Sequence, residues 1–422
     1  MTLPAGLSPI RTTLENGLVT VVKETRKTPI VAINLAVRSG AVCDPPDAPG
    51  TMELLARVLD RGTATRSAAD IAEVFDSRGV SLSISVTRHL VQLVCTCLVE
   101  DFDEIFAVIG DVVMHPSFPE SELTTRKGQA VTAIRQDEDN PFVCASEGLM
   151  EALYGAAHPY GRRIKGSVQS VDACHRDSVA ALHRDRFAPA VTTAVIVGDV
   201  QATQVQALVA DVFGAWHAPE PPDIPLPPVT RATKRSQAVH RMMAKSQADI
   251  AYGFTSIARA DPRYNAYWLM NHVMGQYAIG GRLGDSIRER QGMAYYAGSA
   301  FEANIGPGPL FVRAGVNPAN VDRAIASIDE ELNRARKEGL AQTELDDSRN
   351  FLIGSMPRSL ETNHGIAQFL QTSAMFGLGL DFDVRLPGQL RAVTLADANA
   401  ALLDAFDPSR ATIIIAGPYG TP

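Results

Sequence analysis

Residues 187–198, FAPAVTTAVIVG, are repeated in outline by residues 406–417, FDPSRATIIIAG. The phenylalanine, the proline and the final glycine of the first stretch all recur 219 positions later. The same displacement relates the apolar helical pattern that follows Asp103 to the pattern that follows Asp322. A period this long is not that of a solenoid, so we infer that one unit of about 200 residues is present twice.

A proline-rich segment separates the two copies. Residues 218–228 read APEPPDIPLPP and hold six prolines. Such a segment continues neither a helix nor a central strand, and it behaves as a semi-rigid spacer. We therefore expect an N-terminal domain at 1–217, a linker at 218–229 and a C-terminal domain at 230–422.

Each copy groups its strands ahead of a run of helices. The first opens with a hairpin that turns at Asn16-Gly17, and further alternating apolar runs follow before several helical patterns. This order indicates α+β architecture and not an alternating βαβ fold. We expect two homologous α/β-sandwich domains, each with a mainly antiparallel sheet covered by helices.

Composition excludes several classes of protein. The chain has 39 basic and 47 acidic residues, a net charge of −8, and no cluster of basic residues, which argues against a nucleic-acid-binding protein. No uninterrupted run of 18 apolar residues occurs, so no membrane span is expected. The N-terminus lacks the features of a signal peptide. We therefore expect a cytoplasmic protein, or a periplasmic one if a leader was removed.

The sequence also lacks the usual signatures of a metal or nucleophile site. None of the nine histidines lies three to five residues from another, so no HExxH or HxxEH pair exists. The five cysteines show no CxxC spacing and suggest reduced, mostly buried thiols. No GxSxG elbow is present. We expect no metal bound by this chain.

Two features of the second copy leave open whether they serve structure or function. Residues 275–284 are rich in glycine but lack the spacing and the lysine of phosphate-binding loops. Gly280 and Gly281 suit either a turn between helices or a stretch of backbone that another chain approaches closely. Arg288 and Tyr295 are either structural, which their spacing alone favours, or a guanidinium and a phenol directed at one carbonyl oxygen.

The order of short motifs along the chain resembles a known family. The motifs include Asn16-Gly17, Arg61-Gly62-Thr63, His158-Pro159-Tyr160-Gly161 and the segment from Gly280 to Tyr295. Together they resemble two-domain members of the metallopeptidase family with the inverted zinc motif HxxEH, which includes pitrilysin, insulin-degrading enzyme and the mitochondrial processing peptidase. The resemblance implies two α+β domains that form half of a clamshell around a peptide substrate.

At the zinc motif the chain departs from this family. Glu53 and Arg57 stand where the family has its two histidines. Ala56 replaces the general-base glutamate, and Ala133 replaces the third zinc ligand, 76 residues beyond Arg57. Arginine cannot ligate zinc because it stays protonated and has no acceptor atom. We expect Glu53 and Arg57 to form an ordinary helical ion pair instead.

The resemblance gives the second copy a functional interpretation. Family members use an arginine and a tyrosine seven residues apart to bind the substrate backbone and assist the tetrahedral intermediate. Arg288 and Tyr295 match this pair, and Gly280 and Gly281 fall in the substrate-binding segment before it. The resemblance thus implies the non-zinc subunit of a heterodimeric zinc endopeptidase, inactive alone, whose HxxEH-bearing homologous partner holds the zinc.

Two other functions stay open. Relatives that have lost the zinc ligands also serve as scaffolds, and a stable homodimer that never associates with a zinc-bearing homologue would favour that role. A peptide-binding protein is the other alternative, and it predicts that the isolated chain binds oligopeptides.

Overall fold

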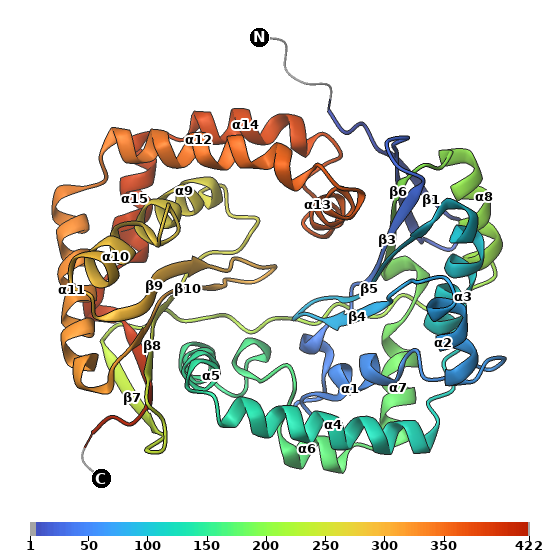
Figure 1. Cartoon of the computed structure of the whole chain (residues 1–422), viewed down its shortest axis with the longest axis horizontal. Coiled ribbons are helices and arrows are strands. Elements are labelled where there is room, and N and C mark those ends of the chain that lie inside the picture. The colour runs from blue at the N-terminus through green and yellow to red at the C-terminus, as the bar shows by residue number, and fades with distance from the viewer. Residues whose placement is uncertain (1–5, 421–422) are drawn as a thin grey trace. The chain divides into compact units, whose positions relative to one another are not determined.

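The computed structural model describes residues 6–420, which form two compact units (Figure 1). Unit 1 comprises residues 6–134, 163–225 and 356–384, and unit 2 comprises residues 135–162, 226–355 and 385–420. These units do not coincide with the contiguous domains expected at 1–217 and 230–422. The difference arises because residues 135–162, from the first half of the chain, belong to unit 2, and residues 356–384, from the second half, belong to unit 1.

Unit 1 is built on a six-stranded sheet in the order β1-β2-β6-β3-β5-β4. All neighbouring strands are antiparallel except β2 and β6, which are parallel. The expected hairpin is present between β1 and β2, where Gly17 has a φ of 95° that favours glycine. The strands are β1 (Ile10–Thr13), β2 (Val19–Glu24), β3 (Ile30–Val37), β4 (Ser83–Val86), β5 (Val91–Leu98) and β6 (Thr192–Gly198).

Helices from the first half of the chain cover one face of this sheet. Because side chains alternate between the faces of a strand, Ile33 and Leu35 of β3 point to this face and pack in one core with Phe106 of α3. The helices of this part are α1 (Thr51–Val58), α2 (Ala68–Asp76), α3 (Phe102–Met114), α4 (Glu120–Glu138), α6 (Val168–Ala173), α7 (Arg176–Arg186) and α8 (Ala202–Phe213).

Unit 2 repeats the plan on a five-stranded sheet in the order β7-β11-β8-β10-β9. Here β7 and β11 are the parallel pair, as β2 and β6 are in unit 1. The strands are β7 (Ser236–Arg241), β8 (Ala248–Thr255), β9 (Ala294–Phe301), β10 (Pro309–Val316) and β11 (Thr412–Gly417). The helices are α9 (Tyr264–Gly275), α10 (Gly281–Gly284), α11 (Val321–Glu338), α12 (Gln342–Ser359), α14 (Phe382–Ala392) and α15 (Leu395–Ala405).

The shared strand order confirms the α+β fold and the duplication inferred from the sequence. The repeated stretches at 187–198 and 406–417 end in β6 and β11, which occupy corresponding places in the two sheets. Each unit therefore has a mainly antiparallel sheet that is covered by helices, as expected.

One helix from each half of the chain packs on the sheet whose strands come from the opposite half. Helix α5 (Pro141–Tyr154) packs on β8 and β11, where Leu149 joins a core with Ala251 and Ile414. Helix α13 (Asn363–Met375) packs on β3 and β6 in the same way (Figure 1). Both helices cover the second apolar face of a sheet, which explains why the units are not contiguous in sequence.

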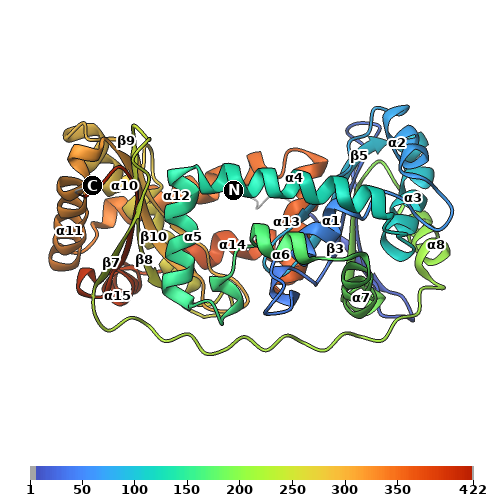
Figure 2. The same ribbon diagram turned by 90° about the horizontal axis from the view of Figure 1, so that it is seen from below.

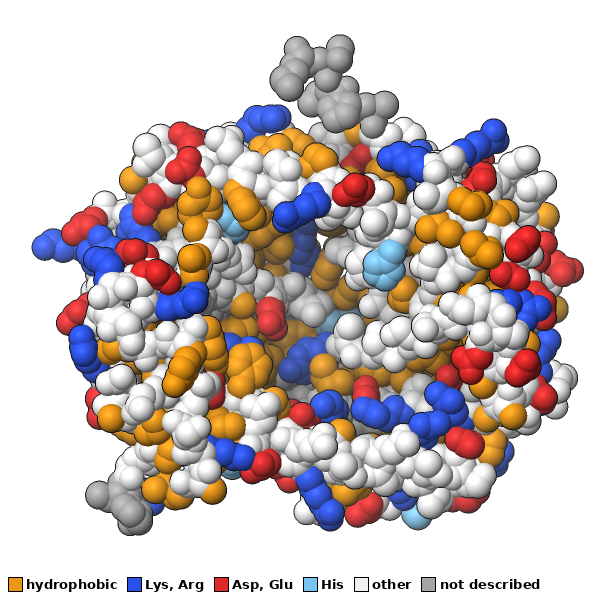
Figure 3. Space-filling model, viewed as in Figure 1, with side chains coloured by type: hydrophobic (Ala, Val, Ile, Leu, Met, Phe, Trp, Pro, Cys, Tyr) orange, Lys and Arg blue, Asp and Glu red, His pale blue; other side chains and the backbone are white. Residues whose placement is uncertain are grey.

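The linker between the halves is extended, as its prolines predict. Residues 216–232 form neither helix nor strand, and Figure 2 shows them as a long connecting trace. On the face drawn in Figure 3, lysine and arginine side chains are interspersed with aspartate and glutamate. No helix between residues 6 and 420 is both long and apolar enough to cross a membrane.

Candidate functional site

Arg288 and Tyr295 lie on consecutive elements of unit 2. Arg288 is in the last turn of the short π-helix η5 (Asp285–Arg290), and Tyr295 is the second residue of β9, at the edge of the sheet. The side chain of Tyr295 is 71% exposed, and that of Arg288 is 42% exposed. The Nε of Arg288 lies 3.7 Å from Glu289 Oε1, which is a loose contact. Both polar ends are therefore accessible to a ligand.

The neighbouring Tyr296 shows that the alternation along β9 is as expected. Its side chain points to the opposite face, and its hydroxyl donates a hydrogen bond to Asp249. Burial, together with this bond, raises the pKa of the Tyr296 hydroxyl. Tyr296 thus has a structural role, and Tyr295 is the exposed tyrosine of the two.

Backbone hydrogen bonds fix the connection between Arg288 and Tyr295. The N–H of Gly292 donates to the carbonyl of Arg288 at 3.0 Å, and the N–H of Met293 donates to Ile287 at 3.2 Å. Gly292 adopts a φ of 60°, the left-handed conformation that ends a helix. The segment that separates the two side chains is therefore a defined turn.

A side chain that sequence reasoning missed supports the same turn. Gln291 accepts a hydrogen bond at its Oε1 from the hydroxyl of Ser327 on α11, at 3.1 Å. Ser327 is buried in the face that α11 presents to the core. Its position in the helical pattern of α11 is the only signal for this contact, and the pattern does not reveal the partner.

Positions 280 and 281 require glycine because of their backbone conformation and because other parts of the backbone approach them closely. Their φ angles are 96° and 60°. A Cβ on Gly281 would lie 2.4 Å from the carbonyl oxygen of Val273, and one on Gly280 would lie 2.3 Å from that of Ala297. These close approaches join α9, α10 and β9, so the segment is a tight turn between helices. A contact of Gly280 and Gly281 with substrate stays a prediction.

An ion pair anchors α10 to α12. Arg282 Nε donates to Glu344 Oε1 at 2.6 Å, and the Arg282 side chain also donates to the carbonyl of Gly339 at 3.1 Å. Burial alone would raise the pKa of Glu344, but the hydrogen bonds and charge of Arg282 outweigh it and hold that pKa below its usual value. The helix that precedes Arg288 is therefore fixed at its start.

The degenerate zinc positions in unit 1 lie on α1 and α4. Glu53 and Arg57 form the expected ion pair, with Arg57 Nε donating to Glu53 Oε1 at 2.9 Å. Ala56 is buried in the core, and Ala133 is half-buried on α4. Within residues 6–420 no group of three histidine, cysteine or acidic side chains is arranged to hold a metal ion. The residues at these positions do not fit zinc.

The local fold of α1 is stabilised without a metal. The buried carboxylate of Asp44 accepts hydrogen bonds from the N–H groups of Gly50 at 2.8 Å and Met52 at 2.7 Å. These are donors that a helix N-terminus leaves unpaired, so Asp44 acts as its cap.

Four of the five cysteines are buried, and Cys43 is half-buried, which agrees with the mostly buried thiols that the sequence suggested. Cys95 and Cys97 point into the core of unit 1, and burial raises the pKa of each thiol to about 12. Such thiols stay protonated at neutral pH and are poor nucleophiles.

Comparisons with known proteins agree with this geometry. The family model described as "Insulinase (Peptidase family M16)" matches residues 19–166, and "Peptidase M16 inactive domain" matches residues 173–352. The chain is 24% identical over 412 residues to the "Uncharacterized zinc protease YmxG" of Bacillus subtilis, covering 96% of this chain and 97% of the relative. It is 24% identical over 387 residues to the "Non-peptidase homolog YmxG" of Helicobacter pylori, covering 90% and 87%.

Solved structures show the same fold. A peptidase M16 inactive domain from Pseudomonas fluorescens aligns with a TM-score of 0.90 at 24% identity, covering 99% of this chain and all of the other. The periplasmic protease PqqL from Escherichia coli aligns with a TM-score of 0.77 at 17% identity, covering 99% of this chain and 47% of PqqL.

Proposed function

The chain belongs to the peptidase M16 family, and on that premise we propose that it is the non-zinc subunit of a heterodimeric zinc endopeptidase. In this proposal Arg288 and Tyr295 bind the backbone of a peptide substrate and stabilise its oxyanion. The homologous partner carries HxxEH and holds the zinc, because the residues at 53, 56, 57 and 133 of this chain do not fit the metal. The chain by itself is inactive.

The observation that supports the proposal is the exposure of Arg288 and Tyr295 on a rigid turn. Among the described residues the Arg288 guanidinium has only the 3.7 Å contact with Glu289 and the Tyr295 hydroxyl has no hydrogen bond, although the backbone between them is fixed by hydrogen bonds. A guanidinium and a phenol can both donate hydrogen bonds to one carbonyl oxygen that becomes negatively charged. Fixed donors of this kind stabilise a transition state without having to reorganise.

The chemical contribution of this chain is limited to binding and charge stabilisation. Its described residues offer no metal set and no activated nucleophile to begin the attack on a peptide bond. Zinc in the partner would supply the Lewis acid and the activated water. Arg288 would orient the peptide through its carbonyl groups, and Tyr295 would add a neutral donor.

Mixing the full-length chain with a zinc-bearing homologue tests this function. We expect the mixture to cleave a fluorescence-quenched peptide faster than either protein alone, and a chelator to abolish the activity. Size-exclusion chromatography of the mixture should show a 1:1 complex. The proposal fails if the mixture is no more active than the zinc-bearing protein by itself.

A scaffold without chemistry is the second candidate. The name of the Helicobacter pylori relative, a non-peptidase homologue, favours it. In that case the chain would form a stable homodimer and would not associate with the zinc-bearing protein. Chromatography and activity measured on the same mixture therefore separate the two functions.

A further inference from the structure

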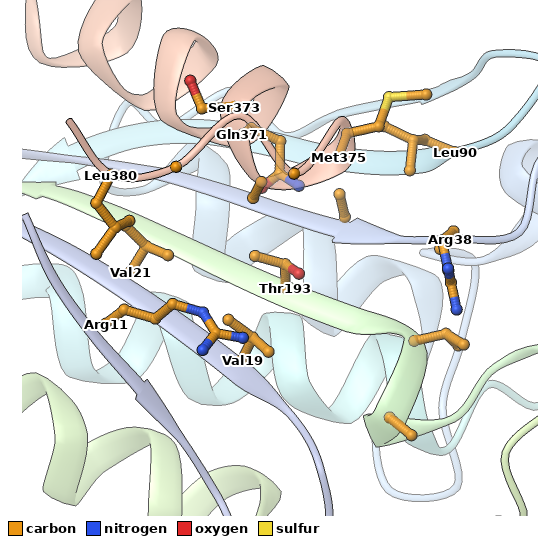
Figure 4. Close-up of a pocket in the computed structure, with 16 residues that line it drawn as sticks. Arg11, Val19, Val21, Arg38, Leu90, Thr193, Gln371, Ser373, Met375 and Leu380 are labelled. Carbon is orange, nitrogen blue, oxygen red and sulfur yellow. The ribbon is translucent and has the colours of Figure 1, made fainter. Parts of the chain in front are cut away.

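A cavity of about 480 Å³ lies in unit 1 beside the C-terminal end of α13 (Figure 4). Val19, Val21 and Thr193 of the sheet line one side, and Met375 and Leu380, from the end of α13 and the segment after it, line the other. The volume is within the range of about 300–1,000 Å³ that is typical of small-molecule sites. It would hold roughly two or three amino-acid residues.

The strand register places the sheet side of the cavity on a single face. Val19 pairs with Thr193, which in turn pairs with Ala36, so these three side chains form one row. Arg11 pairs with Val21 in the adjacent row of the same face. Figure 4 shows the Arg11 guanidinium lying over Val19. A cation therefore borders an apolar surface.

The cavity lining carries positive charge and no negative charge. Arg11 and Arg38 are its two charged side chains, and they lie at opposite ends in Figure 4. Arg38 is 3.8 Å from the carboxylate of Asp223. The Arg11 side chain makes no hydrogen bond or ion pair with any residue between 6 and 420. Arg11 is thus the cation that an anionic ligand can pair with.

A buried amide lines the same space. Gln371 lines the cavity from α13, and Figure 4 shows its amide nitrogen reaching toward the sheet. Only 2% of this residue is exposed, and its Oε1 has almost no accessible surface, so a ligand in the cavity can reach only the Nε2 end. The Nε2 group donates no hydrogen bond to the described residues. A carbonyl oxygen of a ligand would accept one from it.

We propose that this cavity binds the C-terminal end of a peptide whose last residue is aliphatic. Arg11 pairs with the terminal carboxylate, because a guanidinium matches a carboxylate with two parallel hydrogen bonds. The apolar surface around Val19 and Val21 receives the aliphatic side chain. The amide nitrogen of Gln371 donates to the carbonyl oxygen of the last peptide bond. The site lies wholly in unit 1, so it requires neither Arg288 nor a partner subunit.

Calorimetric titration of the full-length chain with three probes tests the site. The probes are acetyl-Ala-Ala-Leu with a free carboxylate, the same peptide as its C-terminal amide, and octanoate. We expect the free acid to bind about 10- to 100-fold more tightly than the amide, which lacks the charge that Arg11 recognises. Octanoate, which has the carboxylate and the tail but no peptide carbonyl, should bind more weakly than the free acid.

Variants identify the side chains responsible. Arg11→Met should remove the preference for acid over amide, and Gln371→Leu should weaken the peptide but not octanoate. Arg184→Met changes an exposed arginine of the same unit and should leave binding unchanged. Failure of this site and failure of the proposed peptidase role are distinguishable, because the preference for acid over amide is measured on this chain alone and peptide cleavage is measured on the mixture with the zinc-bearing homologue.

Three results would overturn the proposal: equal binding of acid and amide, octanoate binding as tightly as the peptide, or no binding of the free acid at millimolar concentration. The comparison of acid with amide needs only the unmodified protein, so the proposal can still be tested if a variant does not fold.

Discussion

Units 1 and 2 share a strand order but differ in the polar groups that they expose. On α1 of unit 1, Arg57 is neutralised by Glu53 at 2.9 Å, and the neighbouring Ala56 is buried in the core. In unit 2, Arg288 has only a loose contact at 3.7 Å, and Tyr295 is largely exposed. In unit 1, the residues at the degenerate zinc positions on α1 are therefore paired with each other or buried. In unit 2, the hydrogen-bond donors of Arg288 and Tyr295 have no close structural partner in the part of the chain that the structure describes.

The largest effect of substitution is expected at Arg288 and Tyr295, the exposed donors of unit 2. If these donors serve the reaction, Arg288→Ala or Tyr295→Phe should lower the peptidase activity of the mixture by about 10²–10³-fold. Steady-state cleavage of a quenched peptide measures the loss. Arg290→Ala, in the same short helix, is the matched control and should change little, since Arg290 pairs with Asp285 at 2.9 Å. Full activity of both variants would show that the pair is structural.

The glycine turn before Arg288 gives the next largest effect. Gly281→Ala would place a Cβ 2.4 Å from the carbonyl of Val273 at a φ of 60°, so we expect a loss of about 2–4 kcal/mol in unfolding free energy. Gly292→Ala has the same φ but open space around the Cβ, and should cost only about 1 kcal/mol. Urea unfolding measures both. Equal losses would mean that the close approach to Val273 is not a constraint.

A smaller effect should follow from the ion pair that anchors α10. Glu344→Gln should lower the unfolding free energy at pH 7 by about 1 kcal/mol, because the pair is only partly buried. The pKa of Glu344 is lowered in the folded state. Its contribution is therefore complete above the usual pKa of 4.5 and is lost as the pH falls through the lower folded value.

Chemical unfolding of the unmodified protein and of Glu344→Gln between pH 3 and pH 7 checks the direction of this pH dependence. The difference in stability between the unmodified protein and Glu344→Gln should shrink toward the acid end. A difference that is constant with pH would contradict the pairing of Glu344 with Arg282.

The smallest effect is expected in unit 1. Glu53→Gln breaks a partly exposed pair on one helix face and should cost only about 0.2–0.5 kcal/mol. Thermal unfolding with and without added zinc measures the change. A large loss, or a shift of the midpoint with zinc, would show that this position still has a role beyond an ordinary helical pair.

The sequence predicted the sheets better than it predicted the helices that cover them. Strands β6 and β11 follow from the repeated stretches, and the hairpin follows from Asn16-Gly17. The ion pair between Glu53 and Arg57 follows from their spacing on a helix. The anchors of the candidate site, Gln291 and Glu344, were missed because their partners are 36 and 62 residues away.

The sequence by itself determined that one α+β unit occurs twice and that the zinc positions are lost in this chain. It also placed Arg288 in the last turn of a helix and Tyr295 near the start of a strand. Tertiary structure decided that α5, from the first half of the chain, covers the sheet of unit 2 and that α13, from the second half, covers the sheet of unit 1. It also decided that Tyr295 stays exposed and that Arg11 and Gln371 border one cavity. The physical reason is that local periodicity tells which face of a helix is apolar, but not which of two similar sheets it will cover.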